Sequence, residues 1–252
     1  MTVNPVLWQP PRAASAPAGY VEREAQLHAV VADVGRRYAR AALASSLSPE
    51  DIVIAHAIAA TAAPIDVFVI DTGRLHAETR ALRDEVEGRL GRPVIVVRPE
   101  PQSVASHVVR HGEFGFYDSV QARHACCELR KVEPLHRALA GRGAWLTGQR
   151  RAHAAERAGL TLEEWDERAG IPKYNPLAAW TDEAVWHYVD RHDLPVNGLH
   201  ARGYASIGCE PCTRAIRADE DSRSGRWWWE SGHAKECGLH VRLDPPSSEQ
   251  PT

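Results

Sequence analysis

Five cysteines are the residues of this sequence with the clearest capacity for chemistry. Cys126 and Cys127 are adjacent, Cys209 and Cys212 form a CxxC pair, and Cys237 stands alone near the end of the chain. Consecutive Cα atoms lie about 3.8 Å apart, closer than the usual disulfide range of about 4.4–6.8 Å, so adjacent cysteines make a poor disulfide. An odd number of cysteines in a chain expected to be cytoplasmic favours metal binding or catalysis over a disulfide framework.

Four of these thiols could form one metal centre. The CxxC spacing lets Cys209 and Cys212 converge on a metal, and the pair Cys126–Cys127 would complete the set. Four thiolates suffice for either a zinc ion or a 4Fe–4S cluster. Zinc sites normally use two spaced pairs, so the adjacent pair favours the cluster somewhat, and a structural zinc knuckle is the alternative.

Cys237 is the fifth thiol, and its neighbours favour reactivity. Lys235 precedes it and His240 follows it, and nearby positive charge stabilises the nucleophilic thiolate. Gly232 and Gly238 would permit movement of this segment. We therefore treat Cys237 as a candidate nucleophile and His240 as its candidate neighbour, although a lone cysteine near a terminus is more often incidental.

Two polar segments have the composition of nucleotide-binding loops. Ser46, Ser48 and Asp51 lie between an expected strand and an expected helix, where hydroxyl and N–H groups suit a phosphate or sulfate. The sequence there lacks the Gly-Lys-Ser of a Walker loop, which argues against ordinary ATP cleavage. The plain alternative is a helix N-cap. The run from Thr72 through Gly73 and Arg74 follows the next expected strand and could meet a ribose or an adenine.

Basic residues near these segments could hold an oxyanion. Gly148 and Arg150 belong to a tight turn with two guanidinium groups, a shape suited to sulfate or phosphate. Lys131 follows the cysteine pair by one helical turn, and Arg223 and Arg226 precede three consecutive tryptophans. Solvated surface charges are the usual alternative for such residues.

Length and composition limit the possible classes of protein. The chain has 252 residues, 44% of them hydrophobic, and a formal net charge of −3. This charge argues against broad nucleic-acid binding, and no apolar run approaches the roughly 18 residues of a membrane span. We expect a loose N-terminal arm over 1–20, a nucleotide- and metal-binding α/β domain over 21–217, a C-terminal catalytic segment over 218–242 and a disordered tail over 243–252.

Alternating helical and strand-like patterns predict how these residues are positioned. Strands are expected at 41–44, 65–70, 93–97 and 144–147, and helices at 52–60, 75–90, 119–140 and 181–191. Such alternation predicts a doubly wound, mostly parallel α/β sheet. The loops 45–51, 71–74 and 147–151 all follow expected strands, so they should form one site at the carboxyl ends of the strands.

At this point the chain resembles the assimilatory sulfonucleotide reductases, specifically the adenylyl-sulfate (APS) reductases. The motifs that carry the resemblance appear in family order across about residues 45–240. They are SLSPED at 46–51, DTGRL at 71–75, CCELRKVEPL at 126–135, WLTGQRR at 145–151, NPL at 175–177, RGYASIGCEPCT at 202–213, GRWWWE at 225–230 and ECGLH at 236–240. Two places differ from the family pattern: Gln149 stands where an apolar residue is expected, and Ala152 to Ala154 replace an Asp-Gln-Ser-like run.

The resemblance implies a fold, a cofactor and a reaction. The fold would be like that of the adenine nucleotide alpha hydrolases, with a 4Fe–4S cluster on Cys126, Cys127, Cys209 and Cys212. Cys237, on a mobile C-terminal catalytic tail, would attack the sulfur of APS, expel AMP and carry an S-sulfonate, from which thioredoxin or a similar dithiol releases sulfite for cysteine biosynthesis. Family positions that hold the phosphosulfate match Lys131, Arg223 and Arg226, and His240 matches a histidine near the nucleophile.

Two other functions compete with this interpretation. A reductase for the 3′-phosphorylated substrate (PAPS) is the nearest, although family members that prefer PAPS usually lack the four cluster cysteines. A zinc-stabilised nucleotide-binding protein without redox chemistry is the other, and it would be colourless and indifferent to loss of Cys237. A homo-oligomer is possible, and no membrane partner is expected.

Overall fold

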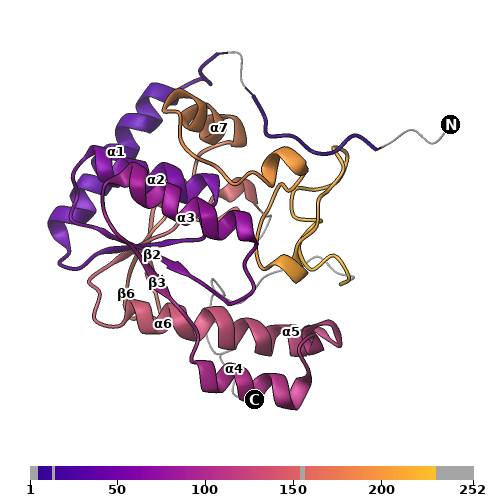
Figure 1. Ribbon diagram of the computed structural model, residues 1–252. Coiled ribbons are helices and arrows are strands. Elements are labelled where there is room, and N and C mark those ends of the chain that lie inside the picture. The colour runs from indigo at the N-terminus through magenta and orange to yellow at the C-terminus, as the bar shows by residue number, and fades with distance from the viewer. Residues whose placement is uncertain (1–4, 13–14, 154–156, 231–252) are drawn as a thin grey trace, which may run out of the picture.

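A six-stranded, mostly parallel sheet forms the centre of the protein (Figure 1). The computed structural model describes residues 5–12, 15–153 and 157–230. All neighbouring strands run parallel except the last two, which form an antiparallel pair at one edge. The strands are β1 (Ala42–Ser45), β2 (Asp66–Ile70), β3 (Val94–Val97), β4 (Trp145–Leu146), β5 (Glu163–Asp166) and β6 (Ile171–Tyr174). The sequence-based prediction of a mostly parallel sheet is confirmed.

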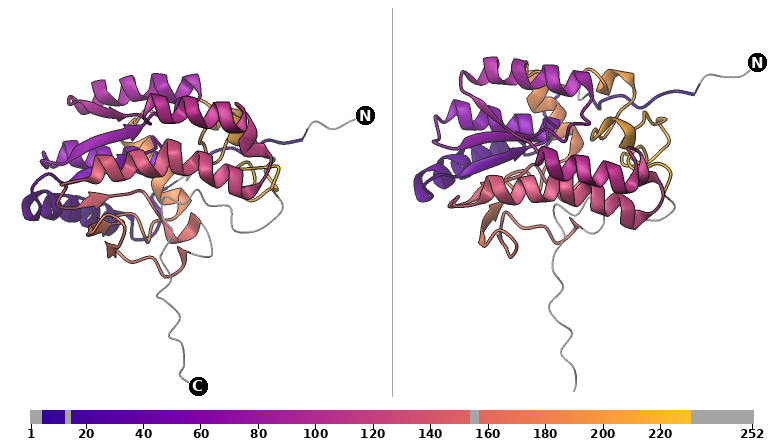
Figure 2. Two further views of the ribbon diagram at one scale, coloured as in Figure 1. Left: turned by 90° about the horizontal axis from the view of Figure 1, so that it is seen from below. Right: turned by 60° about the horizontal axis from the view of Figure 1, so that its bottom comes forward.

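Helices lie on both faces of this sheet (Figures 1 and 2). One face is covered by α1 (Tyr20–Arg37), α2 (Pro49–Ala60), α3 (Ala77–Leu90) and α7 (Asp182–Arg191). The other is covered by α6 (Glu133–Leu139), from which α5 (Val120–Cys127) and α4 (Pro101–His111) extend towards the region after residue 195. A large apolar core fills the first interface, and a smaller one around Phe68, Leu135 and Trp145 fills the second.

The strand order β3-β2-β1-β4-β6-β5 explains where a ligand can bind. From β1 the chain proceeds to β2 and β3 in one direction, and β4 then pairs with the opposite side of β1. The loops after β1 and β4 therefore diverge at the carboxyl ends of two adjacent strands. Such a switch point leaves a crevice at the edge of a doubly wound sheet.

Local sequence accounts for the sharp entry into α2. Ser48 caps the helix by accepting a hydrogen bond from the Asp51 N–H at 3.3 Å, and Pro49 occupies the first turn, where its missing N–H has no consequence. Leu47 has a φ of 61°, an unusual conformation for a branched residue and one that turns the chain abruptly. The helix itself is apolar almost all round because α1, α3 and α7 pack against it.

The predicted helix over 119–140 is present but contains an irregular turn. Glu128–Val132 forms a π-helical turn between α5 and α6, in which the N–H of Glu133 donates to the carbonyl of Glu128. Pro134 supplies a physical reason, because it has no N–H with which to continue the α-helical pattern. The turn lies directly after the cysteine pair and contains Lys131.

The described part of the expected N-terminal arm contacts the rest of the protein. Leu7 pairs with Arg217 as an isolated antiparallel bridge, and the N–H of Trp8 donates to the carbonyl of Ile216 at 3.0 Å. The ring of Trp8 lies 6.4 Å from that of Trp186 on α7. An indole and two backbone bonds therefore hold residues 5–12 against the body of the protein.

The C-terminal boundary predicted at residue 218 does not separate two independent parts. The N–H of Ala218 donates to the carbonyl of Val6, and the N–H of Arg214 donates to that of Gly225. Residues 218–230 thus pack against residues 203–217 and the N-terminal segment 5–12. Among the described residues, no helix has the length and apolarity needed to cross a membrane.

Candidate active site

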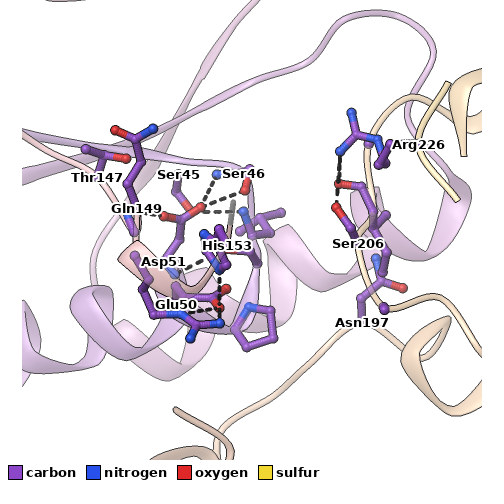
Figure 3. Close-up of a pocket in the computed structure, with 18 of the residues that line it drawn as sticks. Ser45, Ser46, Glu50, Asp51, Thr147, Gln149, His153, Asn197, Ser206 and Arg226 are labelled. Atoms are coloured by element: carbon purple, nitrogen blue, oxygen red, sulfur yellow. Dashed lines mark hydrogen bonds and ion pairs between the residues drawn. The ribbon is translucent and has the colours of Figure 1, made fainter. Parts of the chain in front are cut away.

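A cavity of about 480 Å³ opens at the switch point between β1 and β4, within the usual size range of small-molecule sites (Figure 3). Its walls come from the loops after β1, β2 and β4, from the π-helical turn and from residues 205–227. Nine of the residues predicted from the sequence line it: Ser46, Ser48, Asp51, Thr72, Lys131, Gly148, Arg150, Arg223 and Arg226. The expectation that separate polar loops form one site is therefore met in the described residues.

Asp51 joins the loops after β1 and β4. One oxygen of its buried carboxylate accepts hydrogen bonds from the N–H and the hydroxyl of Ser46, both at 2.7 Å. The other accepts from the N–H of Gly148 at 3.1 Å. A Cβ at position 148 would lie 2.5 Å from that second oxygen, so the close approach of the two loops requires glycine. Asp51 thus holds the shape of the cavity wall.

Arg150, a predicted substrate-binding residue, lines the cavity, but its guanidinium is buried and paired within the protein. It is 2% exposed, and its Nε and Nη2 donate to a Glu50 oxygen at 2.9 and 2.7 Å. The guanidinium also bonds Asp182 and the Trp180 carbonyl. Burial opposes ionisation of Glu50, but the hydrogen bond from His153 and the charge of Arg150 hold its pKa well below the usual range.

In the loop after β2, Thr72 faces the cavity, whereas Gly73 and Arg74 do not. Thr72 lines the cavity, and its hydroxyl lies 3.3 Å from the sulfur of Cys209. Gly73 and Arg74 are not among the lining residues. The Arg74 guanidinium instead bonds the carbonyl of Glu113 and lies over the rings of Phe114 and Phe116, 5.5 and 5.2 Å from their centroids.

Three cations border the side of the cavity that faces the cysteines. Lys131 comes from the π-helical turn, and Arg223 and Arg226 come from the last described loop. The Arg226 guanidinium stacks 4.7 Å from the Trp227 ring centroid and passes so close to Gly208 that a side chain there would collide with it. Its Nε is buried and has no hydrogen-bond partner. This end of the cavity suits an anion.

The four cysteines of the predicted metal centre interact electrostatically with one another, and Cys209 lies next to Thr72. Cys127 and Cys209 are buried, and Cys126 and Cys212 are partly exposed. Burial and the neighbouring Cys209 raise the pKa of Cys126 and of Cys212, the latter to about 12. Burial alone would also raise the pKa of Cys209, but Lys131, the Thr72 hydroxyl and Arg226 outweigh it and lower that pKa. Lys131 and Arg226 thus favour the thiolate form of both Cys209 and Cys212.

The loop that carries the CxxC pair is fixed by backbone contacts. The N–H of Glu210 donates to the Arg74 carbonyl at 2.8 Å, and the hydroxyl of Tyr117 donates to the Pro211 carbonyl at 2.8 Å. Across the described ranges, no three His, Cys, Asp or Glu side chains are arranged around the position of a single metal ion. Four cysteine thiolates are a donor set that suits either a 4Fe–4S cluster or a zinc ion.

Some functional expectations concern residues that the structure does not place. Cys237 and His240 lie outside the described residues, so their predicted roles stay predictions. Conversely, the cavity wall contains polar side chains that motif reasoning missed, among them Gln149, His153 and Asn197. His153 bonds Glu50 at 3.0 Å, and Asn197 bonds the hydroxyl of Thr79 at 2.9 Å. In the sequence, Gln149 was noticed only because it stands where the family pattern has an apolar residue.

Comparison with other proteins places these features in a family. Residues 40–215 match the phosphoadenosine phosphosulfate reductase domain, and the chain belongs to that family. It is 54% identical over 229 residues to adenosine 5′-phosphosulfate reductase from Burkholderia cepacia, covering 91% of this chain and 90% of that protein.

Solved structures support the fold. The phosphate complex of phosphoadenylyl-sulfate (PAPS) reductase from Candida auris superimposes with a TM-score of 0.65 at 24% identity, covering 82% of this chain and 100% of that one. Yeast FAD synthetase matches with a TM-score of 0.54 at 12% identity, over 79% of this chain and 67% of that one. The predicted adenine nucleotide alpha hydrolase-like fold is confirmed.

Proposed function

We propose that the protein reduces adenylyl sulfate (APS) to sulfite and AMP in sulfate assimilation. The cavity carries the proposal: it has a serine loop on one wall, three cations on another, and a threonine, Thr72, whose hydroxyl contacts the sulfur of Cys209. The close relationship to an adenosine 5′-phosphosulfate reductase supports this substrate class. Lys131, Arg223 and Arg226 are placed to balance the negative charge of a phosphosulfate and of the AMP that leaves.

The proposed chemistry proceeds in three displacements at sulfur. The Cys237 thiolate attacks the sulfur of APS, so an S–S bond forms while the S–O bond to the phosphate breaks, and AMP departs with the electron pair. A dithiol such as thioredoxin then attacks the Cys237 sulfur, releases sulfite and becomes a disulfide as its second thiol frees Cys237. The dithiol supplies both electrons. We propose a thioredoxin-like donor, and therefore also a cytoplasmic location, where such dithiols are kept reduced.

Cys126, Cys127, Cys209 and Cys212 would hold the 4Fe–4S cluster. When bound, such a cluster supplies a compact charged centre, and its redox activity is not needed for the displacements above. The protein contributes positive charge near the cluster ligands, since Lys131 and Arg226 lower the pKa of the Cys209 thiol despite its burial. Lys131 borders both the cavity and the cysteines, so it can link the two electrostatically.

The alternative substrate is PAPS, which carries an additional 3′-phosphate. Arg74 belongs to the loop that was expected to meet a ribose or an adenine, but its guanidinium lies over Phe114 and Phe116 and bonds the Glu113 carbonyl. This placement favours APS. With thioredoxin as donor, APS should be turned over in preference to PAPS, and equal use of PAPS would contradict the preference.

The decisive experiment replaces the proposed nucleophile. Cys237→Ser should still bind AMP and keep its iron, because Cys237 is not one of the four proposed ligands, yet it should release no sulfite. The unmutated protein given APS without reductant should yield one AMP per active site and a peptide carrying an SO₃ adduct at Cys237. An adduct on another cysteine, or normal turnover by the serine variant, would show that the mechanism is wrong.

A further inference from the structure

Gln149 is a buried polar side chain of the cavity wall that lacks a partner. The residue is 5% exposed, it lines the cavity, and its Oε1 atom is buried without a hydrogen bond. Buried amide groups are almost always paired in native proteins, and an unpaired acceptor is unfavourable. A donor on a bound ligand is therefore the expected partner of this oxygen.

The neighbours of Gln149 hold it in place. The N–H of Gly148 is bonded to Asp51, and the guanidinium of Arg150 is bonded to Glu50, so the residues on both sides are fixed to the start of α2. Figure 3 shows the amide end of Gln149 directed away from Glu50 and towards Thr147. Arg226 and Ser206 lie on the opposite wall. Gln149 thus stands across the cavity from the cationic end.

The same part of the cavity has an apolar wall. Phe68, Leu135 and Trp145 line the cavity and belong to the smaller core beneath α6. Thr147 follows Trp145 by two residues, which places it on the same side of an extended chain. A neutral amide beside aromatic and aliphatic side chains suits a flat nucleobase better than it suits a phosphate or sulfate.

We propose that Gln149 recognises the adenine ring of the bound nucleotide. Its Oε1 accepts a hydrogen bond from the 6-amino group, and its Nε2 donates to the adjacent ring nitrogen. A glutamine amide matches adenine in this two-point manner because adenine presents a donor and an acceptor side by side. The inference rests on the proposed function, since it takes the AMP portion of the substrate as the ligand, and it makes Gln149 a specificity-determining residue.

The test compares two nucleotides that differ only at the proposed contact. AMP carries the 6-amino group, and purine riboside 5′-monophosphate carries hydrogen there. Calorimetry on the intact protein should find AMP bound about tenfold to a hundredfold more tightly than the analogue. The Gln149→Leu variant should bind AMP more weakly, so that it prefers AMP over the analogue by about twofold or less. The control variant Gln102→Leu, on an exposed part of α4, should keep the preference of the unmutated protein.

The possible results distinguish failure of this inference from failure of the proposed function. Equal weakening of both nucleotides by Gln149→Leu would mean a structural role only, and an unchanged preference would mean no contact; either result overturns the inference. If the leucine variant does not fold, Gln149→Glu keeps the acceptor and should keep the amino-group preference while weakening AMP binding. A wild-type protein that binds AMP without any preference overturns the inference alone, and failure to bind AMP at all overturns both.

Discussion

The two walls of the cavity are built on different principles. The wall at the switch point consists of short loops between a regular strand and helix, held by the buried ion pair of Glu50 with Arg150 and by the hydrogen bonds of Asp51. The wall that carries the CxxC pair consists of irregular chain over 203–230, held by isolated bridges, the stacking of Arg226 on Trp227 and the buried pair of Arg123 with Glu230. The first wall is held by contacts within the protein, whereas we expect the second to depend on the proposed cluster.

Of the substitutions that distinguish the two walls, removal of a cysteine from the CxxC pair should have the largest effect. Cys209→Ser should lose iron and acid-labile sulfide together, and turnover should fall by more than about a hundredfold, because a metal ligand is at least as critical as the groups that orient it. Hydrogen exchange should accelerate over 203–230 but not in β1 or α2. Cys237→Ser is the matched control and should keep its iron. Zinc without labile sulfide in the native protein would favour the zinc-stabilised alternative.

Disruption of the buried charge at the switch point should have the next largest effect. Glu50→Gln leaves Arg150 without its main buried partner, so the free energy of unfolding in urea should fall by about 3 kcal/mol. Glu78→Gln removes an exposed partner of Arg202 and should cost less than about 1 kcal/mol. Equal losses for the two variants would mean that the buried network does not hold the first wall. Iron content should not change in either.

The smallest expected effect lies farther along α2, where His56 contacts the Tyr188 hydroxyl at 2.8 Å. Burial, with His192, His28 and Arg89 nearby, lowers its pKa from 6.5 to about 4, while Glu24 opposes this shift. Because the folded pKa lies below the unfolded one, this contribution to stability is present above about pH 6.5 and is lost as pH falls towards about 4.

His56→Gln should therefore flatten part of the pH dependence of unfolding. The difference between variant and unmutated protein should narrow by roughly 1 kcal/mol between pH 7 and pH 4, a value reduced because His56 is only half buried. Urea titrations at several pH values would measure it. A parallel pair of pH curves would show that His56 does not titrate differently in the folded protein.

Sequence reasoning succeeded where periodic patterns are strong. The four parallel strands it proposed and the helices α2, α3, α5–α6 and α7 lie within a few residues of their expected positions. Helix α1 was missed although Leu27, Val31 and Val34 have helical spacing and are buried. The hairpin of β5 and β6 gave little signal, because β5 reads Glu-Glu-Trp-Asp, a charged edge strand whose Trp165 is 56% exposed.

The site was predictable in its location but less so in the direction of its side chains. Motifs identified the loops that meet at the switch point, but they could not show that Arg150 turns inward to Glu50 or that Arg74 turns towards Phe114 and Phe116. These directions depend on burial and on partners about 40 to 100 residues away. Gln149 illustrates the converse, because an unremarkable residue type became informative only once its burial and missing partner were known.

The buried pair of Arg123 with Glu230 has a consequence for reaction rate. Arg123 donates to both oxygens of Glu230, at 2.7 and 3.0 Å, and so fixes the chain seven residues before Cys237. Seven residues span at most about 25 Å, whatever path they take. A thiol confined to a sphere of that radius has a local concentration on the order of 10 mM or more. The ion pair therefore acts as the fixed end of a tether, which gives the proposed nucleophile an advantage over dilute thiols that must reach the cavity by diffusion.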